Sequence, residues 1–190
     1  GTQWVLGIEQ KDDNGNPLDP DGYYNLHCTI KHYVANNNEG KSSGDTTGRL
    51  RAGAMSSLRM LREYYAQVYG DIIRNTDVSS VMTAYSYYNK VSSSYSSYLM
   101  DTLLRQVYGF DGHITSDCDS VASMQNLNYI NPYTGKVLTA VEALSGALAH
   151  GEDLECNGGY ASSFGNYSSL SSKMVAGDIE TDKGLFTENS

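Results

Sequence analysis

The sequence lacks the features that mark several common classes of protein. No run approaches the roughly 18 apolar residues that a membrane-spanning helix needs, so no membrane partner is expected. Only 13 of its 190 residues are Lys or Arg, against 22 Asp or Glu, and the cations do not cluster. Because nucleic-acid binding needs a concentrated basic surface, we expect no nucleic-acid partner either.

Cysteine and proline are scarce too, with three of each. Three cysteines are too few for a disulfide scaffold, and they lack the paired spacing of a zinc site, so no metal is expected. The chain begins at Gly1 without a basic-then-apolar leader, and we expect the native N-terminus to lie upstream. Localisation is therefore unknown from the sequence, with an extracytoplasmic or secreted location favoured.

Two local patterns resemble ligand loops but are incomplete, so no cofactor is expected. Gly40-Lys41-Ser42 lacks the first glycine of a phosphate loop. The run that begins at Asp12 has the spacing of calcium ligands but lacks the required glycine and the closing glutamate, which indicates a plain turn. Tyrosine is abundant, with 16 residues, and suits sugar-like ligands, although an ordinary polar surface fits the same composition.

Strand-like and helix-like segments alternate through the middle of the chain. Strands are predicted at 28–34, 80–85, 112–117 and 152–156. Helices are predicted at 51–74, at 98–108 and from Thr139 onward. This α/β order indicates parallel strands with helical crossovers, either in a doubly wound sheet or in a partial, roughly half, (β/α)8 TIM barrel. The barrel core would span 28–156, between an irregular lead-in (1–27) and a Ser-rich, acidic tail (157–190).

Apolar residues recur at steps of three and four in each predicted helix, which gives each one a buried face. The first face is predicted to contain Leu58, Leu61, Tyr65, Val68 and Ile72. The second contains Leu99, Leu103 and Val107 and ends at Gly109. The third starts at a capping box of Thr139 and Glu142 and buries Val141, Leu144 and Leu148.

Polar and ionisable residues stand near the C-terminal ends of the predicted strands, where ligands bind in α/β folds. They are Lys31 and His32, then Tyr85, then Ser116 and Asp117, then Asp153 and Glu155. A carboxylate at such a place can act as a nucleophile or stabilise an oxocarbenium-like transition state. Each residue alone could be a helix cap, a solvated lysine or a core histidine, and only their convergence indicates a site.

Five segments at these positions resemble motifs of glycoside hydrolase family 3 and follow the family's order. They are KHYVANN with Glu39 (31–39), LREYY (61–65), VMTAY (81–85), the stretch from YLMDTLLR to TSD (98–117) and ALAHGEDL (147–154). The resemblance implies the nucleophile-bearing part of an N-terminal (β/α)8 domain. Its parent would hydrolyse terminal, non-reducing β-linked xylose or glucose in oligosaccharides or aryl β-glycosides, with retention and without a metal.

The resemblance also implies roles by position. Asp117 would be the catalytic nucleophile, Lys31 and His32 would bind sugar hydroxyls, and Met82 and Tyr85 would line the same subsite. Many β-glucosidases of the family have Trp where this chain has Cys118. This Cys, followed later by Asp-Leu-Glu and Cys156, resembles the β-xylosidase and arabinofuranosidase branch. The two cysteines follow strands that should be neighbours, so a disulfide and two buried thiols both remain open.

Several parts of a complete enzyme are expected outside this chain. The family's acid/base usually comes from a C-terminal sandwich domain, and the other half of the barrel is also missing. Glu152 and Glu155 are acidic, but no family motif assigns them that role. We therefore expect the isolated chain to be inactive. The alternatives are a non-catalytic carbohydrate-binding or structural fragment that lacks the acid/base, and an unrelated α/β binding domain.

Overall fold

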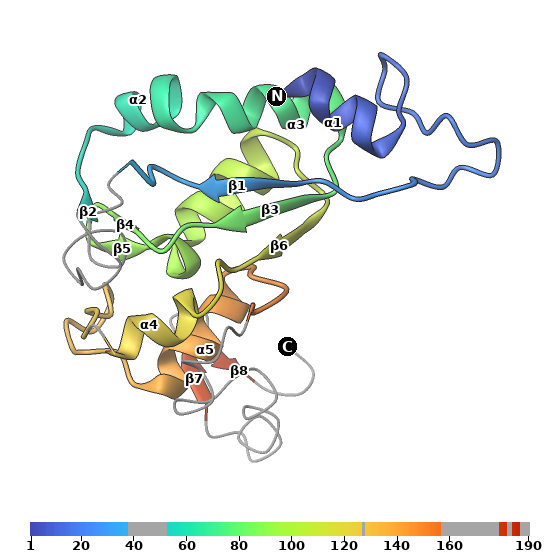
Figure 1. The fold of residues 1–190 in the computed structure, drawn as a ribbon. Helices are drawn as coiled ribbons and strands as arrows, with labels where there is room; N and C mark the ends of the chain where they lie inside the picture. The colour runs from blue at the N-terminus through green and yellow to red at the C-terminus, as the bar shows by residue number, and fades with distance from the viewer. Residues whose placement is uncertain (38–52, 127, 157–178, 182–183, 187–190) are drawn as a thin grey trace.

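A parallel three-stranded sheet lies at the centre of the molecule. The computed structural model describes residues 1–37, 53–126, 128–156, 179–181 and 184–186. The sheet contains β1 (Thr29–Tyr33), β3 (Ser80–Thr83) and β6 (His113–Thr115), in that order, and both pairings are parallel (Figure 1). The fourth predicted strand is reduced to a single parallel bridge between Leu154 and Thr115. A mixed α/β fold with parallel strands is thus confirmed.

One long helical segment connects β1 to β3 and changes its pitch partway along. It consists of α2 (Leu58–Met60), the π-helical η1 (Leu61–Tyr65) and α3 (Gln67–Thr76). Ser57 starts the segment by accepting a hydrogen bond from the Met60 N–H at 3.1 Å. The predicted start near residue 51 was too early, because the described residues 53–57 contain a short strand, β2 (Gly53–Ala54), and the Ser57 cap.

The buried face of this segment differs from the predicted stripe. In η1 the Ala66 N–H donates to the Leu61 carbonyl, five residues back, at 2.8 Å. This wide turn shifts all later side chains around the helix axis. The next fully buried residue after Leu61 is therefore Ala66 rather than Tyr65. Leu58 and Val68 are each 54% exposed, and the prediction that they are buried was wrong.

The second crossover helix shows the same behaviour. The π-helical η3 (Tyr98–Val107) buries Leu99 and Leu103 as predicted, whereas Val107 is 48% exposed, contrary to the prediction. Tyr108 continues the π pattern by donating to the Leu103 carbonyl at 3.0 Å. Gly109 follows with φ 75°, a conformation that glycine adopts without strain.

The third predicted helix has the predicted cap. α5 (Ala140–Ala149) starts with the reciprocal hydrogen bonds of a capping box between Thr139 and Glu142. Leu144 is buried as predicted. A further helix, α4 (Ser120–Asn126), was not predicted; it packs against α5, and the two lie beyond β6 (Figure 1).

Short strands flank this core. β2 (Gly53–Ala54), β4 (Tyr87–Tyr88) and β5 (Val91–Ser92) form a small mixed sheet, which leads into the 3-10 helix η2 (Ser93–Tyr95). In the predicted tail, β7 (Ile179–Thr181) and β8 (Gly184–Phe186) pair antiparallel. The remaining residues of that tail, and the Gly40-Lys41-Ser42 pattern, lie outside the described residues.

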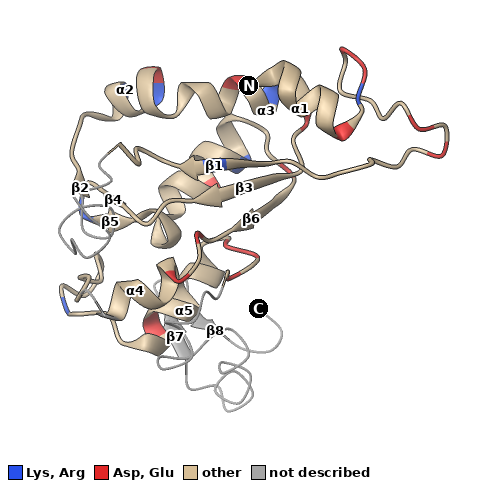
Figure 2. Ribbon diagram, viewed as in Figure 1, with Lys and Arg blue, Asp and Glu red and all other residues tan. Residues whose placement is uncertain are grey.

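The N-terminal segment contains a helix that the sequence analysis missed. α1 (Thr2–Glu9) packs on α3 and buries Val5 and Leu6. The loop that follows reaches away from the body and carries several acidic side chains (Figures 1 and 2). At its start, Asp12 accepts from the N–H groups of Asn14 and Asn16, each at 2.9 Å, which is the plain turn expected there.

A buried ion pair joins α1 to the sheet. Glu9 and Lys11 lie 2.8 Å apart, and both side chains are fully buried. Glu9 also accepts from the N–H groups of Cys28 and Ser79, which precede β1 and β3. No helix within the described ranges is long and apolar enough to cross a membrane, and those ranges hold no cluster of metal-type ligands.

Candidate functional site

Asp117 lies two residues beyond β6 and is held by its backbone on both sides. Its N–H donates to the carbonyl of Thr83, at the end of β3, at 3.2 Å. Its own carbonyl accepts from the N–H of Ser120, the first residue of α4, at 3.0 Å. The residue is only 6% exposed. Its place is therefore set by two neighbouring elements rather than by a loose loop.

The carboxylate of Asp117 faces His32. The Cys118 N–H donates to its Oδ1 at 2.9 Å, and His32 Nε2 lies 3.3 Å from Oδ2. This contact becomes an ion pair when His32 is protonated. His32 is in turn anchored by Tyr69 of α3, whose hydroxyl donates to the His32 carbonyl at 2.6 Å. The peptide bond between Lys31 and His32 is cis.

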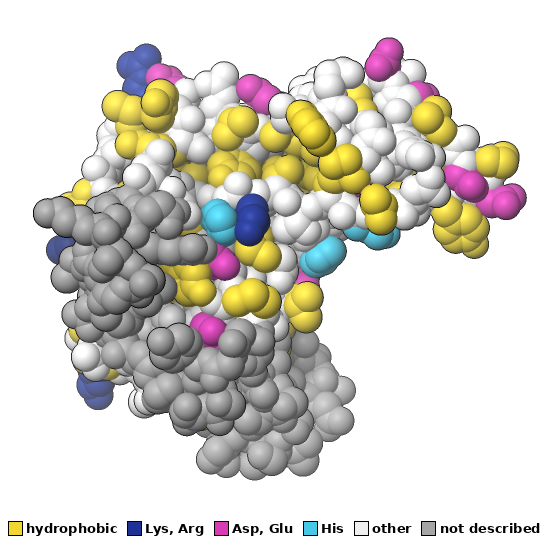
Figure 3. Space-filling model, viewed as in Figure 1, with side chains coloured by type: hydrophobic (Ala, Val, Ile, Leu, Met, Phe, Trp, Pro, Cys, Tyr) yellow, Lys and Arg dark blue, Asp and Glu magenta, His cyan; other side chains and the backbone are white. Residues whose placement is uncertain are grey.

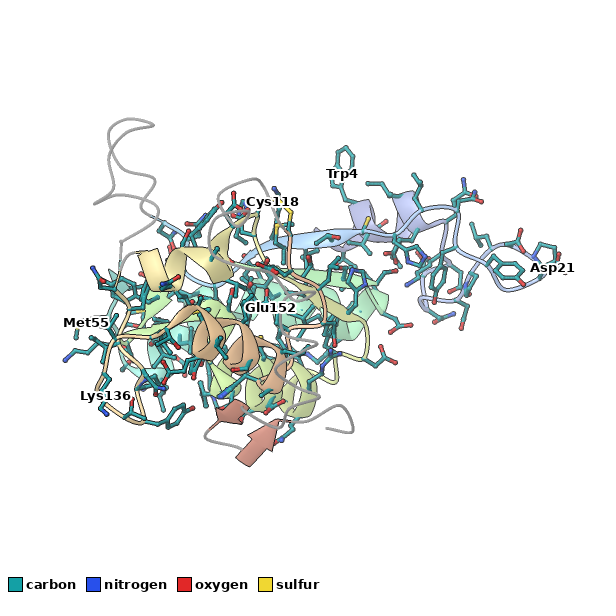
Figure 4. The ribbon with its side chains drawn as sticks, turned by 90° about the horizontal axis from the view of Figure 1, so that it is seen from below. Trp4, Asp21, Met55, Cys118, Lys136 and Glu152 are labelled. Atoms are coloured by element: carbon teal, nitrogen blue, oxygen red, sulfur yellow. A yellow bond between two sulfur atoms is a disulfide. The ribbon has the colours of Figure 1, made fainter. Side chains whose placement is uncertain are left out.

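Tyr85 and Cys118 join the same cluster. The Tyr85 hydroxyl donates to the Cys118 carbonyl, which connects the segment after β3 to the segment after β6. Cys118 forms a disulfide with Cys156, with the two Cα atoms 4.4 Å apart (Figure 4). Of the two alternatives left open by the sequence, the structure has the bridge. Cys156 is tied to the same segment again, because its N–H donates to the Ser116 hydroxyl at 2.9 Å.

Lys31 and Met82 border this cluster. Lys31 is exposed on β1 and, with His32, lines a hollow of about 360 Å³ between the end of β1 and the helical segment around Tyr65. Figure 3 shows a basic side chain beside a histidine over β1, with an acidic side chain just below them. Met82 is half-buried on β3, where it pairs with Thr115 of β6.

Asp153 does not join the group at the strand ends, and that prediction was wrong. Its carboxylate accepts from the Ile114 N–H at 2.8 Å and from Arg105 of η3 at 3.1 Å. Successive residues of an extended segment point to opposite sides, so when Asp153 faces η3 its neighbour Glu152 faces inward. Glu152 is indeed fully buried.

The hydroxyl-lined surroundings of Glu152 were not predicted from the sequence. Its carboxyl accepts from the Thr83 hydroxyl at 2.8 Å, and Thr83 in turn contacts Ser94 of η2 at 2.8 Å. Burial raises the pKa of Glu152 to about 8, against the opposing effect of the Thr83 and Ser94 hydroxyls.

Comparisons with known proteins identify the family of the chain. The model of the glycosyl hydrolase family 3 N-terminal domain matches residues 1–180. The chain is 31% identical to the exo-1,4-beta-xylosidase xlnD of Aspergillus niger over 182 residues, which is 95% of this chain and 20% of that protein. It is 34% identical to the probable xlnD of Aspergillus clavatus over 139 residues, 71% of this chain and 16% of that protein. The chain thus spans about a fifth of the length of the curated relatives it matches.

Solved structures show the same fold. A family 3 exo-beta-xylosidase in complex with a xylobiose aziridine probe aligns with a TM-score of 0.65 at 23% identity, covering 84% of this chain and 19% of that one. Beta-glucosidase 3B from Thermotoga neapolitana in complex with glucose aligns with a TM-score of 0.61 at 22% identity, covering 83% and 19%. From the family model and the xylosidase relatives together, the chain belongs to glycosyl hydrolase family 3.

Proposed function

We propose that this chain is the nucleophile-bearing part of a retaining β-glycosidase, and that Asp117 is the nucleophile. The observation that carries the proposal is the placement of the Asp117 carboxylate at the end of β6, with a backbone donor on Oδ1 and His32 facing Oδ2. A carboxylate that is fixed in this way and only 6% exposed is oriented before a substrate arrives. The family relationship supports the same reaction class.

In the proposed reaction, Asp117 attacks the anomeric carbon as the bond to the leaving oxygen breaks. A second carboxyl group, supplied by the rest of the parent protein, gives its proton to that oxygen. It then takes a proton from the water that displaces the sugar from Asp117, and the two inversions give net retention. In retaining enzymes these two carboxyl groups lie about 5–5.5 Å apart. Lys31 and His32 would donate hydrogen bonds to sugar hydroxyls beside Asp117.

The proposal includes the architecture around the site. The three parallel strands and the bridge at Leu154 would form about half of a (β/α)8 barrel, and the parent would supply the other half. Met82, Tyr85 and Cys118 would line the subsite that holds the terminal sugar. We propose terminal β-linked xylose as the preferred sugar and glucose as a second substrate. The disulfide of Cys118 lies directly beside Asp117 and would fill the space that the hydroxymethyl group of glucose needs and that xylose leaves empty.

The nucleophile is tested in the full-length parent with a fluorinated sugar that traps the covalent intermediate. Peptide mapping should find the label on Asp117. Asp117→Ala should abolish turnover, and added azide should restore it on an activated aryl glycoside through an inverted glycosyl azide. Asp71→Ala, on the exposed side of α3, is the matched control and should label normally. Label on any other residue would refute the assignment. A parent that binds sugar but forms no adduct would favour the non-catalytic alternative.

Substrate choice is tested by kcat/KM on aryl β-xyloside and aryl β-glucoside. We expect the xyloside to be preferred, although a missing hydroxymethyl contact is worth only about 1–3 kcal/mol, so dual activity is consistent with the proposal. A glucoside preference of tenfold or more would refute the choice of xylose. The isolated 190-residue chain should hydrolyse neither substrate, because general acid catalysis is typically worth about 10²–10⁴-fold.

A further inference from the structure

Glu152 is a fully buried carboxyl group for which the proposed glycosidase reaction has no role. It follows α5, where its N–H donates to the Ala147 carbonyl at 3.0 Å, and it precedes the bridge between Leu154 and Thr115. Figure 4 shows Glu152 inside the body of the molecule. Burying a carboxyl group destabilises the folded state unless its neighbours replace the lost hydrogen bonds to water. The groups that contact Glu152 are therefore the first place to look for its role.

A chain of hydroxyl groups runs from Glu152 through three other elements. The Thr83 hydroxyl, at the end of β3, donates to Glu152 Oε1 at 2.8 Å. Thr83 contacts the Ser94 hydroxyl of η2 at 2.8 Å, and Ser94 contacts the Ser120 hydroxyl of α4 at 3.1 Å. All four residues are buried.

The surroundings of Glu152 favour its neutral form. Burial raises its pKa to about 8, and the negative charges of Asp153 and Glu155 act in the same direction, while the Thr83 and Ser94 hydroxyls act against it. Other titratable groups on the elements around it include Asp117 and Asp119 beyond β6, His150 at the end of α5, Tyr95 of η2, and Asp101 and Arg105 of η3. Near pH 6.5 the carboxyl is therefore protonated and can donate as well as accept a hydrogen bond.

The two ends of this hydroxyl chain are the residues that hold Asp117. The Thr83 carbonyl accepts from the Asp117 N–H at 3.2 Å. The Ser120 N–H donates to the Asp117 carbonyl at 3.0 Å. The same two residues therefore belong to the Glu152 chain through their side chains and fix Asp117 through their backbones.

We propose that Glu152 is a positioning residue for Asp117, because its carboxyl accepts from the Thr83 hydroxyl and so keeps Thr83, Ser94 and Ser120 in one hydrogen-bonded chain that fixes the Asp117 backbone on both sides. The effect on activity rests on the proposed role of Asp117, whereas the effect on geometry does not. When Glu152 ionises, a negative charge replaces a neutral group beside two acidic residues. The charged carboxyl attracts the Thr83 and Ser94 hydroxyls more strongly, the hydroxyl chain rearranges around it, and Asp117 moves with Thr83 and Ser120.

The geometric part is tested on the chain itself, without any activity. Infrared spectra of isotope-labelled protein should show a protonated glutamate carboxyl at pH 6.5 that titrates with a midpoint near pH 8. The ¹⁵N shift of the Asp117 amide should follow the same midpoint. Glu152→Gln should remove both signals, and Glu63→Gln, on the exposed side of η1, should remove neither. A wild-type spectrum without the protonated band, or an Asp117 amide that titrates equally in Glu152→Gln, would overturn the inference.

The catalytic part is tested on the full-length parent with a dinitrophenyl glycoside. This leaving group needs no proton donor, so the pre-steady-state burst reports attack by Asp117 rather than the acid/base. The wild-type burst rate should fall at least tenfold between pH 6.5 and pH 9, and the Glu152→Gln rate less than threefold. Equal losses in both proteins would overturn the inference. If the wild type shows neither a burst nor turnover, the proposed function fails, and the Asp117 amide titration then decides the positioning role alone.

A second pair of variants covers the case in which Glu152→Gln does not fold. Thr83→Ser keeps the hydroxyl that donates to Glu152, whereas Thr83→Val has the same shape without it. At pH 6.5 the valine variant should lose at least tenfold in burst rate with little change in KM, and serine should retain the rate within threefold. Valine and serine variants with equal burst rates would overturn the inference.

Discussion

Strand β3 runs between two buried glutamates whose surroundings differ. At its N-terminal end, Glu9 pairs with Lys11 and accepts from the Cys28 and Ser79 N–H groups. At its C-terminal end, Glu152 accepts from the Thr83 hydroxyl. Both carboxyl groups are fully buried. Burial alone would raise the pKa of each, so the difference between the two ends comes from their partners.

The partners decide which form of the carboxyl is stable. At Glu9 burial opposes ionisation, but the Lys11 ammonium and the backbone N–H groups outweigh it, and the pKa is lowered. At Glu152 hydroxyl groups are too weak to outweigh burial, and the pKa rises to about 8. One end of the sheet therefore holds an ionised glutamate, Glu9, and the other holds a protonated glutamate, Glu152. In parallel α/β folds the C-terminal end of the strands is the end that binds ligands.

Removal of the cation should give the largest change in stability. Lys11→Met leaves the Glu9 charge buried without its partner, and we expect the free energy of unfolding to fall by about 3–5 kcal/mol. Urea unfolding at pH 7, followed by circular dichroism, measures the loss. The double variant Glu9→Gln/Lys11→Met should recover part of it. A loss below about 1 kcal/mol would show that the pair is not a fixed charge.

The pair also predicts how stability responds to acid. The folded pKa of Glu9 lies below its unfolded value, so the stability that it contributes is present above the unfolded value of 4.5. It is lost as the pH falls from there through the folded value. The same unfolding experiment, repeated between pH 6 and pH 3, should show a steeper loss for wild type than for the double variant.

Loss of the disulfide should have the next largest effect, at the C-terminal end of the strands. The bridge joins Cys118 and Cys156 across 38 residues, and a loop of that length corresponds to about 3–4 kcal/mol of chain entropy. Cys118→Ala/Cys156→Ala should lose about this much in urea, without reductant. Wild type with reductant should behave like the variant, and Cys28→Ala, which leaves the bridge intact, is the control. Equal midpoints for wild type and the double variant would contradict the expectation.

Titration of Glu152 should have a smaller effect of the opposite sign to that of Glu9. Its folded pKa of about 8 lies above the unfolded 4.5, so the folded state retains the proton that the unfolded state loses. Its contribution is complete below pH 4.5 and declines as the pH rises toward 8. At about 1.4 kcal/mol per pH unit, the decline is about 2–3 kcal/mol between pH 5 and pH 7. Glu152→Gln should abolish this slope, and an unchanged slope would refute the assignment.

An exposed ion pair should show the smallest effect. Arg59 and Glu63 lie 2.9 Å apart on α2 and η1, with 82% and 62% of their side chains exposed. Glu63→Gln should change the free energy of unfolding by about 0.5 kcal/mol or less, and the change should vanish in high salt. A loss that approached that of Lys11→Met would mean that burial is not what separates the two pairs.

The parallel strands and the capped helix could be predicted because their signals are local. Apolar runs identified β1, β3 and β6, and the Thr139–Glu142 pair marked the start of α5. The faces of the other two helices could not be predicted fully, because a π-helical turn shifts the pattern without a local sequence signal. Val68 and Val107 are exposed for that reason, whereas Leu58 precedes the π-helical turn and is exposed at the start of α2.

At the site too, the residues near strand ends could be predicted from the sequence, whereas the hydroxyl chain of Glu152 could not. Parallel strands bring their ends together, and the residues that meet there lie near the end of a strand or just after one: His32, Tyr85, Asp117 and Cys118. The chain of Glu152, Thr83, Ser94 and Ser120 depends on contacts between residues 11 to 69 positions apart. The periodicity of apolar residues along the sequence does not indicate such long-range contacts. Asp153 was misplaced because a shift of one residue in an extended segment reverses the side that it faces.

The third cysteine has a consequence for how the chain acquires its bridge. Three cysteines permit three pairings, and a mispaired product would carry Cys28. In the folded chain, burial and the nearby Glu9 charge raise the pKa of the Cys28 thiol, so its reactive thiolate is scarce. Thiol–disulfide exchange proceeds through the thiolate, so Cys28 is a poor competitor once α1 has docked. Burial of Cys28, with the Glu9 charge acting in the same direction and Lys11 against it, thereby protects the disulfide at the other end of β3 from scrambling.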